Sequence, residues 1–306
     1  AADGNDNVVV GYNAGNDLED GPGNVIIGKS AGAAMTTGDY NVAIGFEAAV
    51  AMTGSSDNNI AIGKRAMQTE ASGADHCIAI GQSALGVQNH ADCKNIAIGV
   101  SAGDAITSGT KNVLIGHEAG STIVDDLENT ALGYNALKGS TQGGYNTAIG
   151  SQALLSGLTG SSNTAIGQGA MHNAAAALND NVAVGMSALY NLNHANADSN
   201  VGIGRSAGAQ TTDASPAAVD EAQQCVFIGA DTESAANDRQ NEIVIGYGGQ
   251  GQGSNTIMLG NGSIGSILCA DTSISAPSDS RVKRDVAASA VGLDFIDKLA
   301  AISYKR

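Results

Sequence analysis

The five residues Asn41-Val-Ala-Ile-Gly45 recur along the chain, for example as Asn95-Ile-Ala-Ile-Gly99 and Asn163-Thr-Ala-Ile-Gly167. Their closing glycines are 17, 18 or 19 residues apart and stand at positions 11, 28, 45, 63, 81, 99, 116, 133, 150, 167, 185 and 204. Three looser copies end at Gly229, Gly246 and Gly260. A constant period of this size predicts a solenoid in which each repeat forms one coil. Fifteen coils at the spacing of β-strands predict a rod about 70 Å long.

Within the motif, Val42 and Ile44 alternate with Asn41 and Ala43, the period of two that indicates a β-strand. We expect the β-branched face to fit an interior. The small alanine face invites close approach by another backbone, from a return strand or a neighbouring subunit. The closing glycine is expected to make the bend. The recurring asparagines, four residues before it, can hydrogen-bond from coil to coil as an internal ladder.

Composition and charge narrow the class of protein. The 306 residues include 42 glycines, 3 prolines and no tryptophan, and aromatic residues make up 3%. A core of Ala, Val and Ile buries little area per residue, so it has to be thin and regular. The net charge of −16 argues against nucleic acid and against anionic membrane surfaces as partners. No apolar run approaches the length that membrane insertion needs.

Changes in the repeat divide the chain into three expected regions. Residues 1–210 form a regular β-roll shaft. Residues 211–277 form an insertion loop and a β neck, because the motif spacing widens to 25 residues between Gly204 and Gly229. Basic residues gather from Ser278 onward, and apolar residues follow a helical spacing over 291–299. Residues 278–306 are therefore expected to begin a different, helix-bearing module.

The Asn-x-Ala-Ile-Gly repeats over residues 5–262 resemble those of the trimeric β-roll heads of trimeric autotransporter adhesins and the related repeats of phage tail fibres. The resemblance implies an all-β fold, a repetitive left-handed parallel β-roll or β-solenoid that assembles as a homotrimeric fibre. The left-handed β-helix of acyltransferases also has coils of about 18 residues, but its hexapeptide signature recurs three times per coil. Here Ile-Gly-x-x-Ala occurs once per coil.

A second resemblance concerns the C-terminal segment. Ser278-Asp279-Ser280-Arg281-Val282-Lys283, followed by Gly292-Leu-Asp-Phe-Ile-Asp-Lys-Leu299 and Ser303-Tyr-Lys305, resembles the start of the intramolecular chaperone of phage endosialidases and tail fibres, the S74 peptidase class. In that family the domain trimerises the fibre and then cuts itself off. The resemblance implies cleavage between Ser278 and Asp279, with Ser278 as nucleophile and Lys283 as its activating partner.

These features lead to the expected function. The chain is expected to be the shaft of a viral, phage-type tail fibre or tailspike, extracellular and part of the virion, that presents loops to the host cell surface. Its expected partners are two further copies of itself, other virion tail proteins, and a glycan or protein receptor. A bacterial trimeric surface adhesin is the first alternative. A glycan-degrading tailspike is the second, although no pair of carboxylates stands out for hydrolysis.

Several side chains leave binding roles open, although no cofactor is expected. His76, Cys77, His90 and Cys93 allow a zinc-like cluster, a Cys77–Cys93 disulfide between neighbouring coils, or, as the favoured interpretation, small buried cysteines. Cys77 and Cys225 each occupy the position that asparagine holds elsewhere. Acidic residues in two loops are candidate calcium ligands, with solvated surface as the default: Asp17, Glu19 and Asp20, and Asp125, Asp126 and Glu128. Four aromatic residues that follow closing glycines should point outward, where they could stack on sugars: Tyr12, Phe46, Tyr134 and Tyr247.

Overall fold

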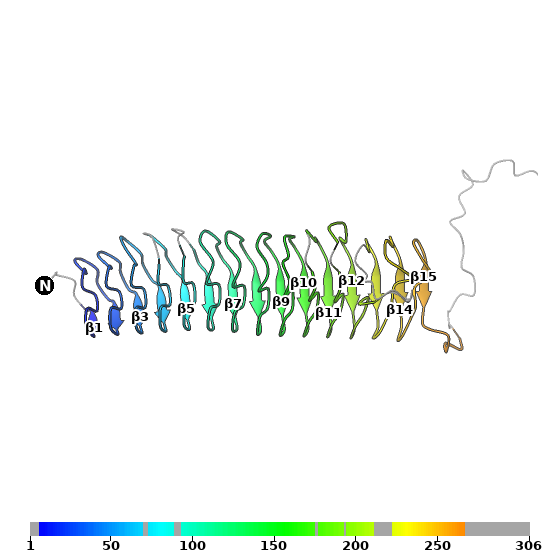
Figure 1. The fold of residues 1–306 in the computed structure, drawn as a ribbon, viewed down its shortest axis with the longest axis horizontal. Helices are drawn as coiled ribbons and strands as arrows, with labels where there is room; N and C mark the ends of the chain where they lie inside the picture. Colours follow the sequence, from blue (N-terminus) through cyan, green and yellow to red (C-terminus); the bar gives the residue numbers. More distant parts are fainter. Residues whose placement is uncertain are drawn as a thin grey trace, which may run out of the picture. The chain divides into compact units, whose positions relative to one another are not determined.

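The computed structural model describes residues 6–69, 73–88, 93–174, 177–192, 194–210 and 222–266. The chain divides into two compact units, residues 1–263 and 264–306. The first unit is a solenoid whose coils lie one after another in sequence order (Figure 1). Of the second unit only residues 264–266 are described, so the helix expected over 291–299 lies outside the described residues.

Each coil contributes one strand of three residues to a single parallel sheet. The fifteen strands are hydrogen-bonded in chain order, and each motif pairs in register with the next, as Val42 does with Ile60. The strands are β1 (Val8–Val10), β2 (Val25–Ile27), β3 (Val42–Ile44), β4 (Ile60–Ile62), β5 (Ile78–Ile80), β6 (Ile96–Ile98), β7 (Val113–Ile115), β8 (Thr130–Leu132), β9 (Thr147–Ile149), β10 (Thr164–Ile166), β11 (Val182–Val184), β12 (Val201–Ile203), β13 (Val226–Ile228), β14 (Ile243–Ile245) and β15 (Ile257–Leu259).

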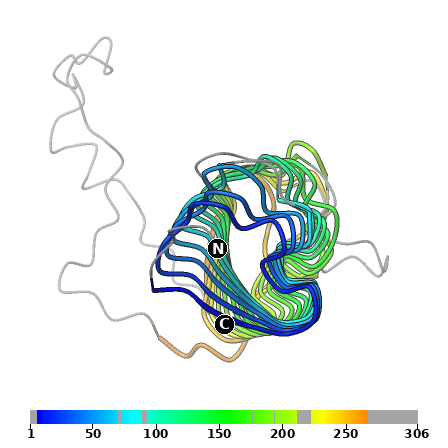
Figure 2. The same ribbon diagram turned by 90° about the vertical axis from the view of Figure 1, so that its left-hand side faces the viewer.

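The predicted solenoid of fifteen repeats is therefore confirmed, and the described residues contain no helix. Seen along the stack, successive coils follow nearly the same path (Figure 2). The sheet continues from β12 to β13 across the widened spacing between Gly204 and Gly229.

The direction of the strand side chains corrects one expectation. From β2 to β14 the middle residue of each strand is buried, while the two flanking residues are partly or fully exposed. Ala43 is fully buried, so the small face points into the coil and Val42 and Ile44 point outward. The expectation that the β-branched face lies inside was wrong. The interior is narrow, because the opposite wall brings Ala49 into the same core.

The closing glycine is required at its position for two reasons. Gly45 has a φ of +138°, which side-chain-bearing residues rarely adopt. A Cβ atom at Gly45 would also lie 2.5 Å from the carbonyl oxygen of Gly63 in the next coil. The same contact recurs from coil to coil, so the column of glycines allows neighbouring bends to stack closely. The predicted bend is confirmed.

The asparagine ladder is present, and it links the strand to the facing loop. The backbone N–H of Asn41 donates to Oδ1 of Asn24 at 2.8 Å, and Nδ2 of Asn41 donates to the carbonyl oxygen of Ser56 at 2.7 Å. Both bonds are buried, so each asparagine satisfies backbone groups in the neighbouring coil. Cys77 and Cys225 keep the backbone bond to the preceding asparagine, at 2.9 Å in both cases.

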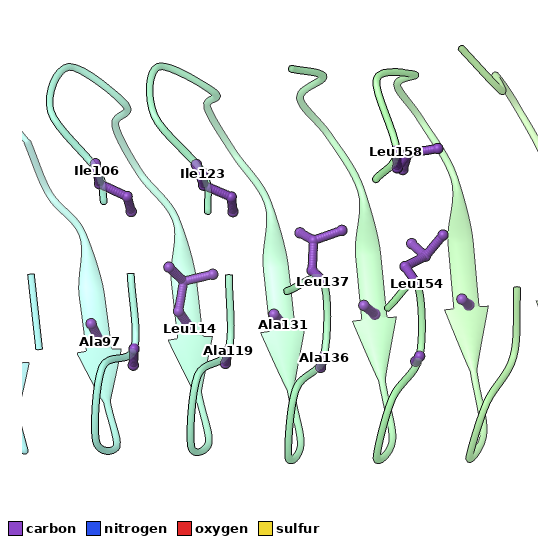
Figure 3. Packing of buried hydrophobic residues seen from close by; sticks show 14 of the residues in the cluster. Ala97, Ile106, Leu114, Ala119, Ile123, Ala131, Ala136, Leu137, Leu154 and Leu158 are labelled. Carbon is purple, nitrogen blue, oxygen red and sulfur yellow. The ribbon is translucent and has the colours of Figure 1, made fainter. Parts of the chain in front are cut away.

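Core volume is shared between the two walls of the coil (Figure 3). Leu114, at the centre of β7, is matched by Gly120 on the opposite wall, whereas Ala131, at the centre of β8, is matched by Leu137. A Cβ atom at Gly120 would lie 2.8 Å from side-chain carbons of both Leu114 and Ile123. One wall is therefore large where the other is small, which keeps a thin core densely packed.

This sharing of volume predicts strong coupling between two positions. Leu114→Ala should lower the free energy of unfolding by about 2–5 kcal/mol because it leaves a cavity. Gly120→Leu should lower it by about 1–3 kcal/mol because it overfills the core. The double variant reproduces the Ala131 and Leu137 arrangement of the next coil, so its loss should be clearly smaller than the sum of the two. Urea unfolding followed by circular dichroism measures all three, and additive losses would contradict shared packing.

Candidate functional site: the outward face of the sheet

The outward face of the sheet is the largest uniform surface of the described solenoid. It is formed by the first and third residues of each strand, which make two parallel columns along the stack. Every one of these residues is aliphatic except for three threonines, and none is charged. The first column is Val8, Val25, Val42, Ile60, Ile78, Ile96, Val113, Thr130, Thr147, Thr164, Val182, Val201, Val226, Ile243 and Ile257; the second is Val10, Ile27, Ile44, Ile62, Ile80, Ile98, Ile115, Leu132, Ile149, Ile166, Val184, Ile203, Ile228, Ile245 and Leu259.

This face leaves a large apolar area open to solvent in one chain. Leu132 is 46% exposed, Ile203 41% and Ile166 38%. Two columns about 7 Å apart over a stack of about 70 Å cover on the order of 500 Å². Soluble proteins rarely leave a continuous apolar patch of this size exposed unless it binds something. Parallel sheets, moreover, are almost always covered on both faces.

Charged side chains lie elsewhere on the coil, where they form ion pairs between neighbouring coils. Arg65 Nε lies 2.8 Å from Glu47 Oε2, and Lys111 Nζ lies 3.0 Å from Glu128 Oε1. These exposed pairs add little to stability individually. Lys138 also donates a hydrogen bond to Glu118, and this bond holds the pKa of the Glu118 carboxyl below its usual value. The outward sheet face is therefore uncharged, and the ion pairs lie on the turns just before and just after the strands.

A second ladder of side chains was not predicted. The backbone N–H groups of Asp39 and Asp57 donate to Oδ1 of Asp57 and Asp75 in the next coil, each at 2.8 Å. Desolvation raises the pKa of the Asp39 carboxyl, and the charges of Asp57 and Asp20 add to the effect. A sequence signal existed, because these aspartates stand six residues before the closing glycine in three successive repeats.

The candidate metal ligands do not come together. Within the described part of the chain, no three His, Cys, Asp or Glu side chains are grouped as a cation would need. The carboxylate of Asp126, one of the candidate calcium ligands, instead accepts a hydrogen bond from the N–H of Gly143 at 2.7 Å. Its pKa is raised, mainly by desolvation.

The cysteines take the role of a cross-link between coils. Cys77 and Cys93 form a disulfide, with Cα atoms 6.2 Å apart, a normal separation for such a bond. Their sulfurs are therefore not available for the zinc-like cluster, and His90 lies outside the described residues. Cys225 is a buried free thiol whose pKa is raised mainly by desolvation, so it stays protonated and unreactive.

The cysteine chemistry predicts a labelling pattern. Alkylation of the folded protein followed by peptide mapping should recover Cys77 and Cys93 as one linked peptide and leave Cys225 unmodified until the chain is unfolded. Reduction should lower the free energy of unfolding by about 3 kcal/mol, since the bond closes a loop of this length. Free, labelled thiols at both Cys77 and Cys93 in the untreated protein would contradict the cross-link.

The four aromatic residues that follow closing glycines point outward, as predicted. Tyr12 is 77% exposed, Tyr247 69%, Tyr134 52% and Phe46 38%. The ring of Tyr134 stacks on His117 of the preceding coil with centroids 5.5 Å apart. A second stacked pair, His172 and Tyr190, was missed because it occurs once and at a different position in the coil.

The predicted self-cleavage residues Ser278, Asp279 and Lys283 lie outside the described residues. Within the described part, no helix is long and apolar enough to span a membrane. Comparisons with models of protein families, with curated proteins and with solved structures found no match to the chain. The fold is thus shown by the structure itself, and any function rests on its surfaces and on the sequence resemblances.

Proposed function

We propose that this chain is the shaft of a homotrimeric viral fibre, in which three solenoids pack through the outward faces of their sheets and hold loops towards the surface of a host cell. The observation that carries the proposal is the uncharged, aliphatic outward face, which runs through all fifteen strands. Burying it in an assembly would remove exposed apolar area from water along the whole stack.

The width of the face suits a threefold arrangement. In a closed ring of three, each subunit uses one patch against one neighbour and a second patch against the other. The two columns of each sheet supply two such patches, one column for each neighbour. In a rod assembled in this way the ion pairs lie outside the sheet interface. The net charge of −16 per chain makes separate fibres repel one another.

The C-terminal segment enters the proposal through its resemblance to the phage intramolecular chaperones. In this proposal residues 278–306 belong to a module that assembles the trimer and then releases it. Lys283 accepts the proton of the Ser278 hydroxyl, whose oxygen attacks the carbonyl carbon of the Ser278–Asp279 peptide bond. The C–N bond breaks, Lys283 gives the proton to the leaving amine of Asp279, and water hydrolyses the resulting ester to leave a free carboxylate at Ser278. The fibre belongs to the virion, with other tail proteins and a glycan or protein on the host as partners.

Assembly is tested by placing a charge on the outward face. Native mass spectrometry of the purified chain should give three times 30.3 kDa. Leu132→Asp should convert most of the protein to monomer at micromolar concentration, because three carboxylates would be buried near the same axis. The matched control is Val124→Asp, which puts the same charge on a residue that is 41% exposed but lies off the sheet. A monomeric wild-type chain, or equal effects of the two variants, would refute the assembly.

Self-cleavage is tested on the full-length gene product by denaturing mass spectrometry. The wild-type chain should split after Ser278, and both Ser278→Ala and Lys283→Ala should remain whole, since the first lacks the attacking hydroxyl and the second lacks the base that accepts its proton. Ser280→Ala is the control and should split like the wild type. An uncut wild-type protein would refute the self-cleaving chaperone. The trimeric shaft would still be tested separately, by native mass spectrometry.

A further inference from the structure

A hollow on the surface of the solenoid lies beside the stacked rings of His172 and Tyr190. Five residues after the closing glycine, successive coils place His172, Tyr190 and then Ala209 at the same position. The rings of His172 and Tyr190 are nearly parallel, at 9°, with centroids 4.8 Å apart. His172 covers Tyr190 on the side of the preceding coil. On the side of the following coil the same position is held by Ala209, a buried residue with a short side chain, so the stack of rings ends at Tyr190.

The hollow has a volume of about 210 Å³ and is lined by Ser187, Tyr190, Asn191, Ser206, Ala209 and Gln210. A second hollow of about 190 Å³ adjoins it and shares Ser206 and Gln210. Together the two approach the size of ordinary ligand pockets, about 300–1,000 Å³. Neither is lined by residues of the outward sheet face.

Polar groups surround the ring. A chain of amides follows the same coils: Asn173 Nδ2 donates to Asn191 Oδ1 at 2.7 Å, and Asn191 Nδ2 donates to the carbonyl oxygen of Ala209 at 3.2 Å. These bonds hold Asn191 in place beside Tyr190. The next residue at this position is Gln210, whose exposed side chain lines both hollows. The hydroxyls of Ser187 and Ser206 complete the border of the first hollow.

The second hollow is lined by charged side chains whose net charge is not positive. Arg205 is paired with Asp231, and Glu233 accepts a hydrogen bond from Gln250 Nε2 at 3.3 Å. The pair and the glutamate offer donors and acceptors to hydroxyl groups. The net charge of these three side chains is negative, as is that of the whole chain, so an anionic ligand is disfavoured.

We propose that the hollow beside Tyr190 binds the pyranose ring of a neutral hexose or N-acetylhexosamine. The apolar C–H face of the sugar stacks on the ring of Tyr190. Gln210, Ser187 and Ser206 hydrogen-bond the hydroxyl groups at its rim. The sugar site rests on the proposed function in host attachment. It adds the class of ligand and the place on the shaft where that ligand binds.

The test uses the intact chain and six probes, the methyl glycosides of glucose, galactose, mannose, N-acetylglucosamine, N-acetylgalactosamine and glucuronic acid. Saturation-transfer NMR should detect at least one of the five neutral probes, and glucuronic acid should give no signal. Tyr190→Ala should weaken the binding at least tenfold. Tyr134→Ala is the matched control, because it removes a histidine-stacked tyrosine that lines neither hollow, and it should bind like the wild type.

Absence of any signal from the neutral probes, or equal losses in Tyr190→Ala and Tyr134→Ala, would overturn the site. Thermal unfolding of each variant shows whether a loss comes from misfolding, and Gln210→Ala, an exposed change that spares the core, then gives the second measurement of the site. Native mass spectrometry of the same samples separates the two proposals. A trimer that binds no sugar overturns the sugar site alone, and a monomer that binds through Tyr190 overturns the assembly alone.

Discussion

The in-register stacking of one coil on the next is the constraint on which the rest of this structure depends. At β-sheet spacing, two backbone bends can lie in contact only if neither carries a Cβ atom, so each coil needs a glycine at the same position. The same spacing brings asparagines of neighbouring coils within hydrogen-bond distance, and they satisfy the buried N–H group just before the strand and a carbonyl group of the facing loop. Glycine leaves room for the bends to stack closely, and asparagine stabilises the stack by hydrogen bonds.

Stacking at a fixed spacing also determines which surfaces the protein has. A residue that recurs at one position of the coil becomes a column along the shaft, so a preference at a single position turns into a continuous stripe. Aliphatic residues at the two outer strand positions thereby form the apolar face. Charged residues at other positions form ladders of ion pairs. A single break in a column, such as the change from Tyr190 to Ala209, leaves a hollow bounded by regular neighbours.

What could be predicted from the sequence follows from the same logic. The strands, the bend glycine and the asparagine ladder repeat at fixed positions, so the repeat revealed them. The inward side of the strand was assigned wrongly, because the alternation of Val42, Ala43 and Ile44 is compatible with either side facing the core. The opposite wall decides it, because it leaves room for alanine in most coils and admits a larger inward residue such as Leu114 where it carries glycine itself. The His172–Tyr190 pair was missed because it depends on two particular coils becoming neighbours in register.

We propose that the outward face of the sheet, rather than any other side of the solenoid, is the assembly face. A cryo-electron microscopy structure of the purified chain tests this proposal most directly. We expect three parallel solenoids around a common axis, with the columns of Ile98 and Leu132 buried against neighbouring subunits and the ion pair of Arg65 and Glu47 outside the interface. A single solenoid with its aliphatic columns in solvent, or an assembly that places another side of the coil on the axis, would contradict it.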